Sequence, residues 1–101
     1  MWIQLSNGKR IKLWFSYSYE ICYSKLEFTI GKKVNRIIKY HTITTCYIDD
    51  GVFTYEGKAV CNPNDKFVKE IGRNISLDRC LKNMDYPLGY ILEIKKAYQN
   101  R

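Results

Sequence analysis

The chain has 101 residues, which is enough for one domain with a modest hydrophobic core. Hydrophobic residues make up 46% of it, which excludes a disordered chain, and no apolar run approaches the roughly 20 residues of a membrane-spanning helix. Seventeen Lys and Arg against ten Asp and Glu give a net charge of +7, which favours polyanionic partners such as nucleic acid or an acidic protein. From this length we expect residues 1–101 to form a single domain. The N-terminal residues do not have the pattern of a signal peptide, so we expect a soluble, cytoplasmic protein.

The first two predicted strands flank Asn7-Gly8. Apolar and polar residues alternate on both sides of this dipeptide. Asn-Gly between alternating runs is the strongest short-range hairpin signal, because both central residues of a type I′ turn need positive φ. The pattern predicts strands at about 2–6 and 9–17.

Three further strands are predicted between residues 25 and 61. The Tyr- and Ser-rich stretch 16–23 can extend the second strand or form a connection, and alternating apolar residues then indicate a strand at about 25–30. Residues 34–48 are strongly β-prone, but this stretch exceeds the usual strand length, so we expect a bulge or bend near 39–42. A turn at 49–51 then predicts that 52–61 returns antiparallel.

The best helix signal follows Pro63, which has no N–H to donate to a strand ladder. Asn64 or Asp65 can cap a helix, and apolar residues then recur at helical spacing, which predicts a helix over about 65–82. Its expected core-facing stripe consists of Phe67, Ile71, Ile75, Leu77 and Leu81. Gly72 beside this stripe and Gly57 in the preceding strand predict a close approach of the helix to the sheet.

The predicted fold class is α+β: an antiparallel sheet of about five strands, with the 65–82 helix packed on one face and a short C-terminal helix. Pro87 suits the first turn of that final helix, and a strand at 89–94 is the alternative. The expected core includes Leu13, Phe28, Ile43, Phe53, Phe67, Ile71 and Ile75. An aspartate in place of Ile71 is then expected to unfold the domain, because it would bury an unpaired charge.

No catalytic or metal-binding pattern is present in the sequence. It contains no Gly-rich phosphate loop and no nucleophile elbow. Asp49 and Asp50 lie in a turn, where a structural role is sufficient, and the only histidine, His41, has no catalytic partner nearby in sequence. The four cysteines lack metal-type C-x-x-C spacing: Cys22, Cys46, Cys61 and Cys80. We therefore expect a non-enzymatic protein with reduced cysteines and neither a metal nor a cofactor.

Basic residues interleave with aromatic ones in two clusters. The first consists of Lys9, Arg10, Lys12, Trp14, Tyr17 and Tyr19. The second consists of Lys32, Lys33, Arg36, Lys39 and Tyr40. Aromatic faces stack on unpaired bases while Lys and Arg follow the phosphate backbone. Tyrosine is also common at half-buried sheet positions and in protein interfaces, so structural and binding roles both stay open.

The stretch from Gly57 to Leu81 resembles one that recurs in small uncharacterised bacteriophage proteins. The matching pattern is Gly57-x-Ala59-x-Cys61-x-Pro63-x-Asp65-x-Phe67, then Gly72-Arg73-x-Ile75 and Arg79-Cys80-Leu81. It covers about a quarter of the chain, and those proteins tend to carry Ala where this chain has Ser76 and Cys80. The resemblance implies a phage accessory protein in the bacterial cytoplasm. Such proteins often bind and block host factors, including defence nucleases, as anti-CRISPR proteins do.

A weaker likeness is to the double-stranded-RNA-binding domain. That fold also runs from antiparallel strands into a helix with basic residues near its start, where this chain has Lys66 and Lys69. Its leading helix has no counterpart, because residues 1–15 predict a hairpin. The likeness is an analogy at the level of the fold.

Two hypotheses for the function follow from these patterns. One is a protein-binding inhibitor of a bacterial nucleic-acid-handling machine, with a host protein or ribonucleoprotein complex as partner. The other is a module that binds RNA or DNA directly through a basic, Tyr-rich surface. The partner-binding residues that we expect are Lys66, Lys69 and Arg73 on the helix, Lys32, Lys33 and Arg36 at a sheet turn, and Tyr17 and Tyr19.

Overall fold

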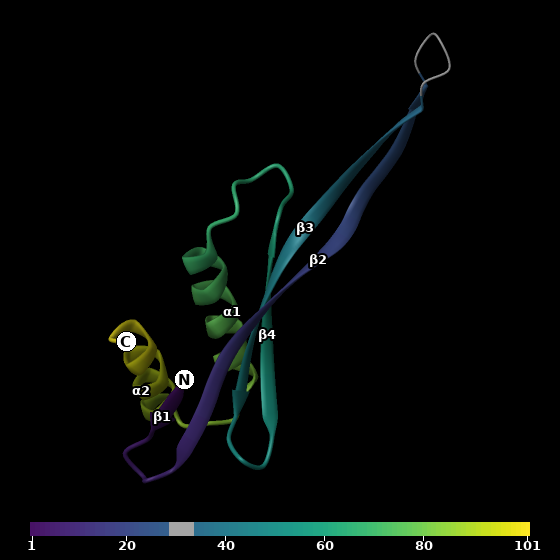
Figure 1. Ribbon diagram of the computed structural model, residues 1–101. Coiled ribbons are helices and arrows are strands. Elements are labelled where there is room, and N and C mark those ends of the chain that lie inside the picture. Colours follow the sequence, from purple (N-terminus) through teal and green to yellow (C-terminus); the bar gives the residue numbers. More distant parts are fainter. Residues whose placement is uncertain (29–33) are drawn as a thin grey trace.

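Figure 1 presents the protein as a computed structural model, which confirms the α+β class. It describes the backbone of residues 1–28 and 34–101 and the side chains of residues 1–22 and 38–101. The elements in chain order are β1 (Trp2–Gln4), β2 (Arg10–Phe28), β3 (Val34–Asp49), β4 (Thr54–Cys61), α1 (Lys69–Asn83) and α2 (Leu88–Gln99).

The four strands form one antiparallel sheet in the order β1-β2-β3-β4. The described part of the chain has four strands rather than about five, because the predicted strands at 9–17 and 25–30 are one continuous strand, β2. Residues 18–24 contain neither Gly nor Pro, so nothing in the sequence interrupts the pairing of β2 with β3 there.

The far ends of β2 and β3 form a two-stranded ribbon that leaves the rest of the molecule (Figure 1). β1 pairs only with Arg10–Lys12, and β4 pairs only with Thr42–Asp49, so neither edge strand accompanies the ribbon. The register shifts between Ile21 and Tyr23, which places a bulge at Cys22. The bulge predicted near residues 39–42 of β3 therefore lies in β2 instead, directly opposite Lys39 and Tyr40.

Helix α1 packs closely on the sheet over small residues. A Cβ atom on Gly57 of β4 would overlap the backbone of Ser76 and Cys80 in α1. A Cβ on Gly72 would lie 2.5 Å from the Thr44 Oγ1 atom of β3. The predicted close approach at Gly57 and Gly72 is confirmed. Both helices lie on the same side of the sheet, so neither covers the other side in the part of the chain that the structure describes (Figure 1).

The core is a single cluster between the sheet and the two helices. Leu77 and Leu81 of α1 meet Ile94 and Tyr98 of α2 there. The strands contribute Ile3, Ile11, Leu13, Cys46 and Ile48.

The predicted core is right for Leu13 and wrong for three of its members. Phe53 is 63% exposed, Ile71 57% and Ile75 41%. For Ile71 and Ile75 the reason is the orientation of α1, which turns its small residues toward the sheet and Leu77 toward α2, so that the Ile71 side faces solvent. Phe53 lies in the β3–β4 turn, before β4 begins at Thr54. Ile43 and Phe67 are half-buried, and the side chain of Phe28 lies outside the described residues.

The helix boundaries also differ in detail from the prediction. Helix α1 begins at Lys69 rather than at about 65, and its N-cap, Val68, makes no side-chain capping bond. Asn64 and Asp65 belong instead to the preceding connection. The C-terminal segment is a helix rather than a strand, and Pro87 is its N-cap residue.

Candidate nucleic-acid interface

The uncovered face of the sheet gathers aromatic and basic side chains from three strands. Directly paired residues share a face, and the register pairs Trp2 with Lys12 and Trp14 with Tyr47. Ile11 and Leu13 are buried under the helices, so the alternating residues Lys12 and Trp14 point the other way. We call this surface the open face, formed by Trp2, Arg10, Lys12, Trp14 and Tyr47.

The side chains of the open face contact one another in a continuous ladder. The Trp14 and Tyr47 rings are stacked, with centroids 5.3 Å apart and planes inclined by 18°. Lys12 Nζ lies 5.5 Å from the Trp14 ring centroid and 5.9 Å from that of Trp2, and the Arg10 guanidinium lies 5.1 Å from the Trp2 ring. Trp2 is 60% exposed. Cations and aromatic faces therefore alternate along this edge of the sheet.

The open face continues across the sheet as small and basic positions. The next row runs from Ser16 through Thr45 to Lys58 of β4. Three strand spacings separate β1 from β4, so the face is roughly 14 Å wide. It thus carries basic side chains near both edges, with aromatic rings between them. By the same register, the acidic side chains of Asp49, opposite Lys12, and Glu56, opposite Tyr47, also belong to this face.

Two of the predicted site residues meet Tyr17 on the helix-covered face instead. Arg73 Nε donates a hydrogen bond of 2.5 Å to the Tyr17 hydroxyl, and the Arg73 guanidinium lies 5.4 Å from the Phe15 ring. Lys69 Nζ lies 5.1 Å from the Tyr17 ring centroid. The hydrogen bond to Tyr17 raises the pKa of Arg73, which is half-buried. Arg73 is therefore part of the contact between α1 and β2, while Lys69 is exposed.

The other predicted site residues are dispersed. Lys66 is exposed in the connection before α1, where it lines an open cleft of about 260 Å³ beside Phe67 and Ile71. Tyr19 is 72% exposed on the ribbon. Lys32 and Lys33 lie outside the described residues. Arg36 is described only by its backbone, which pairs with Leu26. The structure therefore does not bring the predicted residues together in one surface.

Sequence reasoning found part of the open face and missed the rest. Arg10, Lys12 and Trp14 belong to the first predicted cluster, but that cluster joined them to Tyr17 and Tyr19, which point to the opposite face. The two-residue alternation of a strand is the signal that separates the two sets. Trp2 and Tyr47 were missed because only the register places them beside Lys12 and Trp14.

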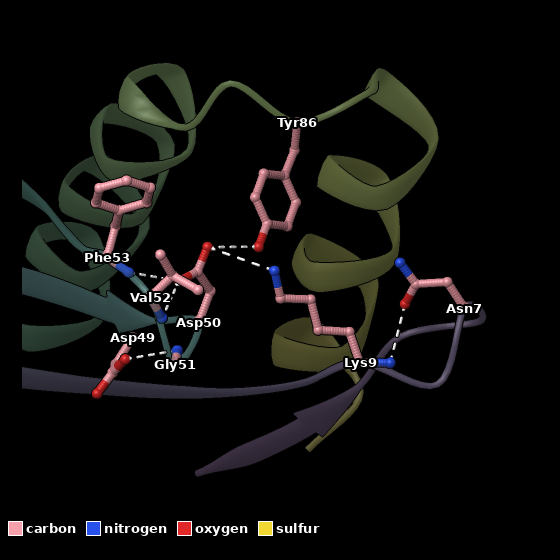
Figure 2. Close-up of polar contacts among 8 residues, drawn as sticks. All are labelled: Asn7, Lys9, Asp49, Asp50, Gly51, Val52, Phe53 and Tyr86. Carbon is pink, nitrogen blue, oxygen red and sulfur yellow. Dashed lines mark hydrogen bonds and ion pairs between the residues drawn. The ribbon is translucent and has the colours of Figure 1, made fainter.

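A second polar cluster joins the β3–β4 turn to the first hairpin and to the connection between α1 and α2 (Figure 2). Asp50 Oδ1 accepts hydrogen bonds from the backbone N–H groups of Val52, at 2.9 Å, and Phe53, at 2.7 Å. Asp50 Oδ2 accepts a 2.8 Å hydrogen bond from the Tyr86 hydroxyl and lies 3.6 Å from Lys9 Nζ. The carboxylate thus holds together its own turn, the first hairpin and the α1–α2 connection.

The electrostatics of this cluster stabilise the ionised Asp50 carboxylate. Burial alone would raise the pKa of the Asp50 carboxyl, but the hydrogen bonds from Phe53, Val52 and Tyr86 and the charge of Lys9 outweigh it and lower the pKa to about 2. The Tyr86 pKa is raised, chiefly by burial, and the Lys9 pKa is raised, chiefly by its hydrogen bond to Tyr86. A tyrosine or lysine that acts as a base or nucleophile needs the opposite shift.

The four cysteines are free. Cys46 and Cys80 are buried against each other between β3 and α1, and their hydrogen bond, with burial, raises the pKa of the Cys46 thiol. Cys22 is exposed and Cys61 is half-buried. Among the residues that the structure describes, no group of three His, Cys, Asp or Glu side chains could hold a metal ion. No helix in the same residues is long and apolar enough to cross a membrane.

Comparisons with known proteins identified no relative. No protein-family profile matches the chain, and searches of curated proteins and of solved structures also found no match.

Proposed function

We propose that the protein binds single-stranded nucleic acid on the open face of its sheet. One observation carries the proposal. Both tryptophans of the chain, Trp2 and Trp14, lie on the side of the sheet that no helix covers, and Lys12 lies over both rings with Arg10 beside them.

In this proposal the aromatic side chains stack on bases and the basic side chains contact phosphates. Every base has a π-face, so Trp2, Trp14 and Tyr47 can stack on successive bases without reading their sequence. Arg10 and Lys12 are placed to follow the phosphates beside the stacked bases. A duplex hides its base faces between neighbouring pairs, so this surface favours a single strand. The net charge of +7 adds a long-range attraction that speeds encounter.

A purely structural role accounts for Trp14 better than for Trp2. The stacked pair of Trp14 and Tyr47 could simply stabilise the sheet, as cross-strand aromatic pairs do. Trp2, however, lies on the three-residue strand β1 and is 60% exposed. Its ring contacts cations rather than the core, which is the environment of a binding surface.

The test is fluorescence anisotropy with labelled oligo(dT) and oligo(U) of about 12 nucleotides, a length that covers one small binding face. Trp2→Ala should weaken binding at least about fivefold, because one stacked base contributes about 1–3 kcal/mol. Lys12→Ala should weaken binding and reduce the salt slope by about 0.7, the value for one phosphate contact on a single strand. Lys66→Ala is the matched control, because Lys66 is equally exposed but lies away from the open face.

The chain also supplies an internal readout for this experiment. Because both tryptophans lie on the open face, bound nucleic acid should quench the intrinsic tryptophan emission. With Arg10, Lys12 and Lys58 all engaged, raising the salt from about 50 mM to about 200 mM should weaken binding roughly 20-fold. Unchanged emission at saturating oligonucleotide, or equal losses in Lys12→Ala and Lys66→Ala, would contradict the proposal.

A second candidate is the phage inhibitor that the resemblance implies, with a host protein or ribonucleoprotein as partner. The observation that favours it is a set of exposed apolar residues on the two helices: Ile71, Ile75, Leu88 and Leu92. Apolar anchors of this kind serve protein interfaces and depend little on salt. Pull-down from a nuclease-treated bacterial lysate separates the two candidates. Capture of a host protein that survives about 200 mM salt and the Trp2→Ala change would favour the inhibitor over the nucleic-acid binder.

A further inference from the structure

The two outer edges of the sheet differ in whether other groups bond to their outward-facing backbone atoms. On β4, the Arg79 side chain donates a 2.6 Å hydrogen bond to the Lys58 carbonyl, and Asn83 Nδ2 donates one of 2.7 Å to the Glu56 carbonyl. Alternate residues of an edge strand point their N–H and C=O groups outward, so these are edge carbonyls. Helix α1 therefore closes this edge against further pairing.

The edge on β2 is closed only as far as Leu13. Leu13 exchanges two backbone hydrogen bonds with Met1, at 2.9 Å from its N–H and 2.6 Å to its C=O. The alternate residues that follow point their backbone groups in the same outward direction: Phe15, Tyr17, Tyr19 and Ile21. Among the described residues, no backbone hydrogen bond joins another segment to this part of the edge. The bulge at Cys22 ends the regular edge on the other side.

This free edge lacks the features that keep natural edges unpaired. Residues 14–22 contain no Pro and no Gly, and Glu20 is their only charged residue. Tyr19 is 72% exposed and Ile21 58% exposed, so apolar surface accompanies the open backbone groups. In a protein of net charge +7, the strand itself brings no positive charge to this stretch, and the nearest cations, Lys69 and Arg73 of α1, lie over the Tyr17 ring.

We propose that β2 of a second copy pairs antiparallel with this edge about a twofold axis. The free window from Phe15 to Ile21 is centred on Ser18, so a symmetric pairing of the whole window must place Ser18 opposite its own copy. Tyr17 then lies opposite Tyr19 of the second copy, and Phe15 lies opposite its Ile21. These are the aromatic and β-branched cross-strand pairs that stabilise sheets, and Glu20 faces Ser16 rather than a like charge.

The same register fits the two ends of the window. Met1 occupies the edge at Leu13, and the bulge of the second copy at Cys22 lies opposite Trp14, one residue before that filled position. Pairing therefore stops where the edge is already filled. A self-complementary window bounded by β1 on one side and by a bulge on the other favours a second copy over an unrelated strand.

The dimer would form one eight-stranded sheet. Its twofold axis stands perpendicular to the sheet, so the open faces of both copies lie on the same side. This consequence rests on the proposed function: a single nucleic-acid strand could then reach two copies of Trp2 and Trp14. The pairing itself is tested without nucleic acid, so its failure would leave binding by a single copy unaffected.

The experiment measures association of the full chain by sedimentation velocity at micromolar concentrations. The wild type should sediment as a dimer. Tyr19→Pro should raise the dimer dissociation constant at least tenfold, because its N–H points outward and the substitution removes no bond of the β2–β3 ladder. Val60→Pro is the matched control, because Val60 is also exposed and outward-directed, but on the edge of β4 that α1 closes. It should leave the dimer intact.

A cross-linking variant fixes the register and does not depend on a proline. Ser18 pairs with its own copy at a non-hydrogen-bonded position, where Cα atoms are about 4.5 Å apart and a disulfide can form. In a Cys22→Ser background, Ser18→Cys should give a disulfide-linked dimer under mild oxidation, and Ser16→Cys should not. A wild type that stays monomeric, open-ended aggregates in place of dimers, or equal cross-linking at both positions would overturn the proposal.

Discussion

The two faces of this sheet differ in the size of the side chains that they carry. On the covered face, α1 approaches the strands closely because Gly57 and Ala59 present almost no side chain to it. On the open face lie the largest side chains of the protein, the exposed Trp2 and the half-buried Trp14, both in contact with Lys12. The sheet thus buries its small residues and keeps its largest aromatic ones outside the core.

This inversion shows which residues the fold needs and which it does not. Contact between α1 and the sheet depends on the absence of side chains, so its energetics are set by close packing of backbone. The tryptophans contribute nothing to the core cluster, which contains no residue of the open face. Under the proposed function, these aromatic residues serve binding more than stability. Substitutions on the two faces should therefore have separable effects, on stability and on affinity.

Apart from placing a charge in the core, the largest expected effect is on the covered face. Gly57→Ala should lower the free energy of unfolding by about 3 kcal/mol, the upper part of the usual range for overpacking, because its Cβ would overlap backbone atoms that cannot rotate away. Gly89→Ala is the matched control, since a Cβ there meets nothing within 4 Å, and it should stabilise the protein by about 0.5 kcal/mol. Urea denaturation measures both. Equal effects of the two substitutions would show that α1 does not rest on Gly57.

Much of this fold follows from local sequence signals. The alternation of Ile11 and Leu13, the Asn7-Gly8 turn and the turn at 49–51 each report a local preference, and each strand they predict is present. The close approach of the helix also follows, because Gly57 and Gly72 have little other use in a strand and a helix.

The orientation of α1 could not be predicted in the same way. Hydrophobic periodicity assumes that the largest apolar residues face the core, and in α1 that rule selects Ile71 and Ile75. Instead, Gly72, Ser76 and Cys80 are the residues of α1 that face the sheet, because close contact between helix and sheet backbone requires small residues. The buried Ser76 satisfies its hydroxyl on the Arg73 carbonyl at 3.1 Å, so its polarity costs little.

The open face was only partly predictable for a related reason. Its ladder is made by register between strands, with Trp2 opposite Lys12 and Trp14 opposite Tyr47. Register is a long-range property that the hydrophobic pattern constrains only to within two residues. The linear clusters in the sequence therefore mixed residues that belong to opposite faces.

The next largest expected effect is a loss of stability at low pH, caused by protonation of the Asp50 carboxyl. The carboxyl of Asp50 is 3% exposed, and its pKa falls from 3.8 to about 2 on folding. A depressed carboxyl pKa stabilises the folded state above the unfolded pKa, and this stabilisation is lost as pH falls through the folded value. The protein should therefore lose about 2 kcal/mol from this group between about pH 5 and pH 2, and the rest of the roughly 2.5 kcal/mol below that range. Chemical denaturation across that range measures the loss.

The control isolates this carboxyl from the others. Asp50→Asn keeps the shape but no longer titrates, so its unfolding free energy should fall less steeply over the same pH range. Asp78→Asn removes a carboxylate whose ion pair with Lys95 is about half exposed, and it should leave the pH profile close to that of the wild type. A wild-type profile as flat as that of Asp50→Asn would show that the Asp50 hydrogen bonds do not stabilise the fold.

The smallest expected effect tests the orientation of α1. Ile71→Asp should change the free energy of unfolding by less than about 1 kcal/mol, because Ile71 is 57% exposed and a carboxylate in the first turn of a helix interacts favourably with its dipole. Leu77→Asp, at a position that is 2% exposed, should prevent folding, because it would place an unpaired charge in the core. A folded Ile71→Asp variant that still quenches its tryptophans with oligo(dT) would place binding on the open face. Loss of folding in Ile71→Asp would instead restore Ile71 to the core and contradict the orientation on which the contrast between the two faces depends.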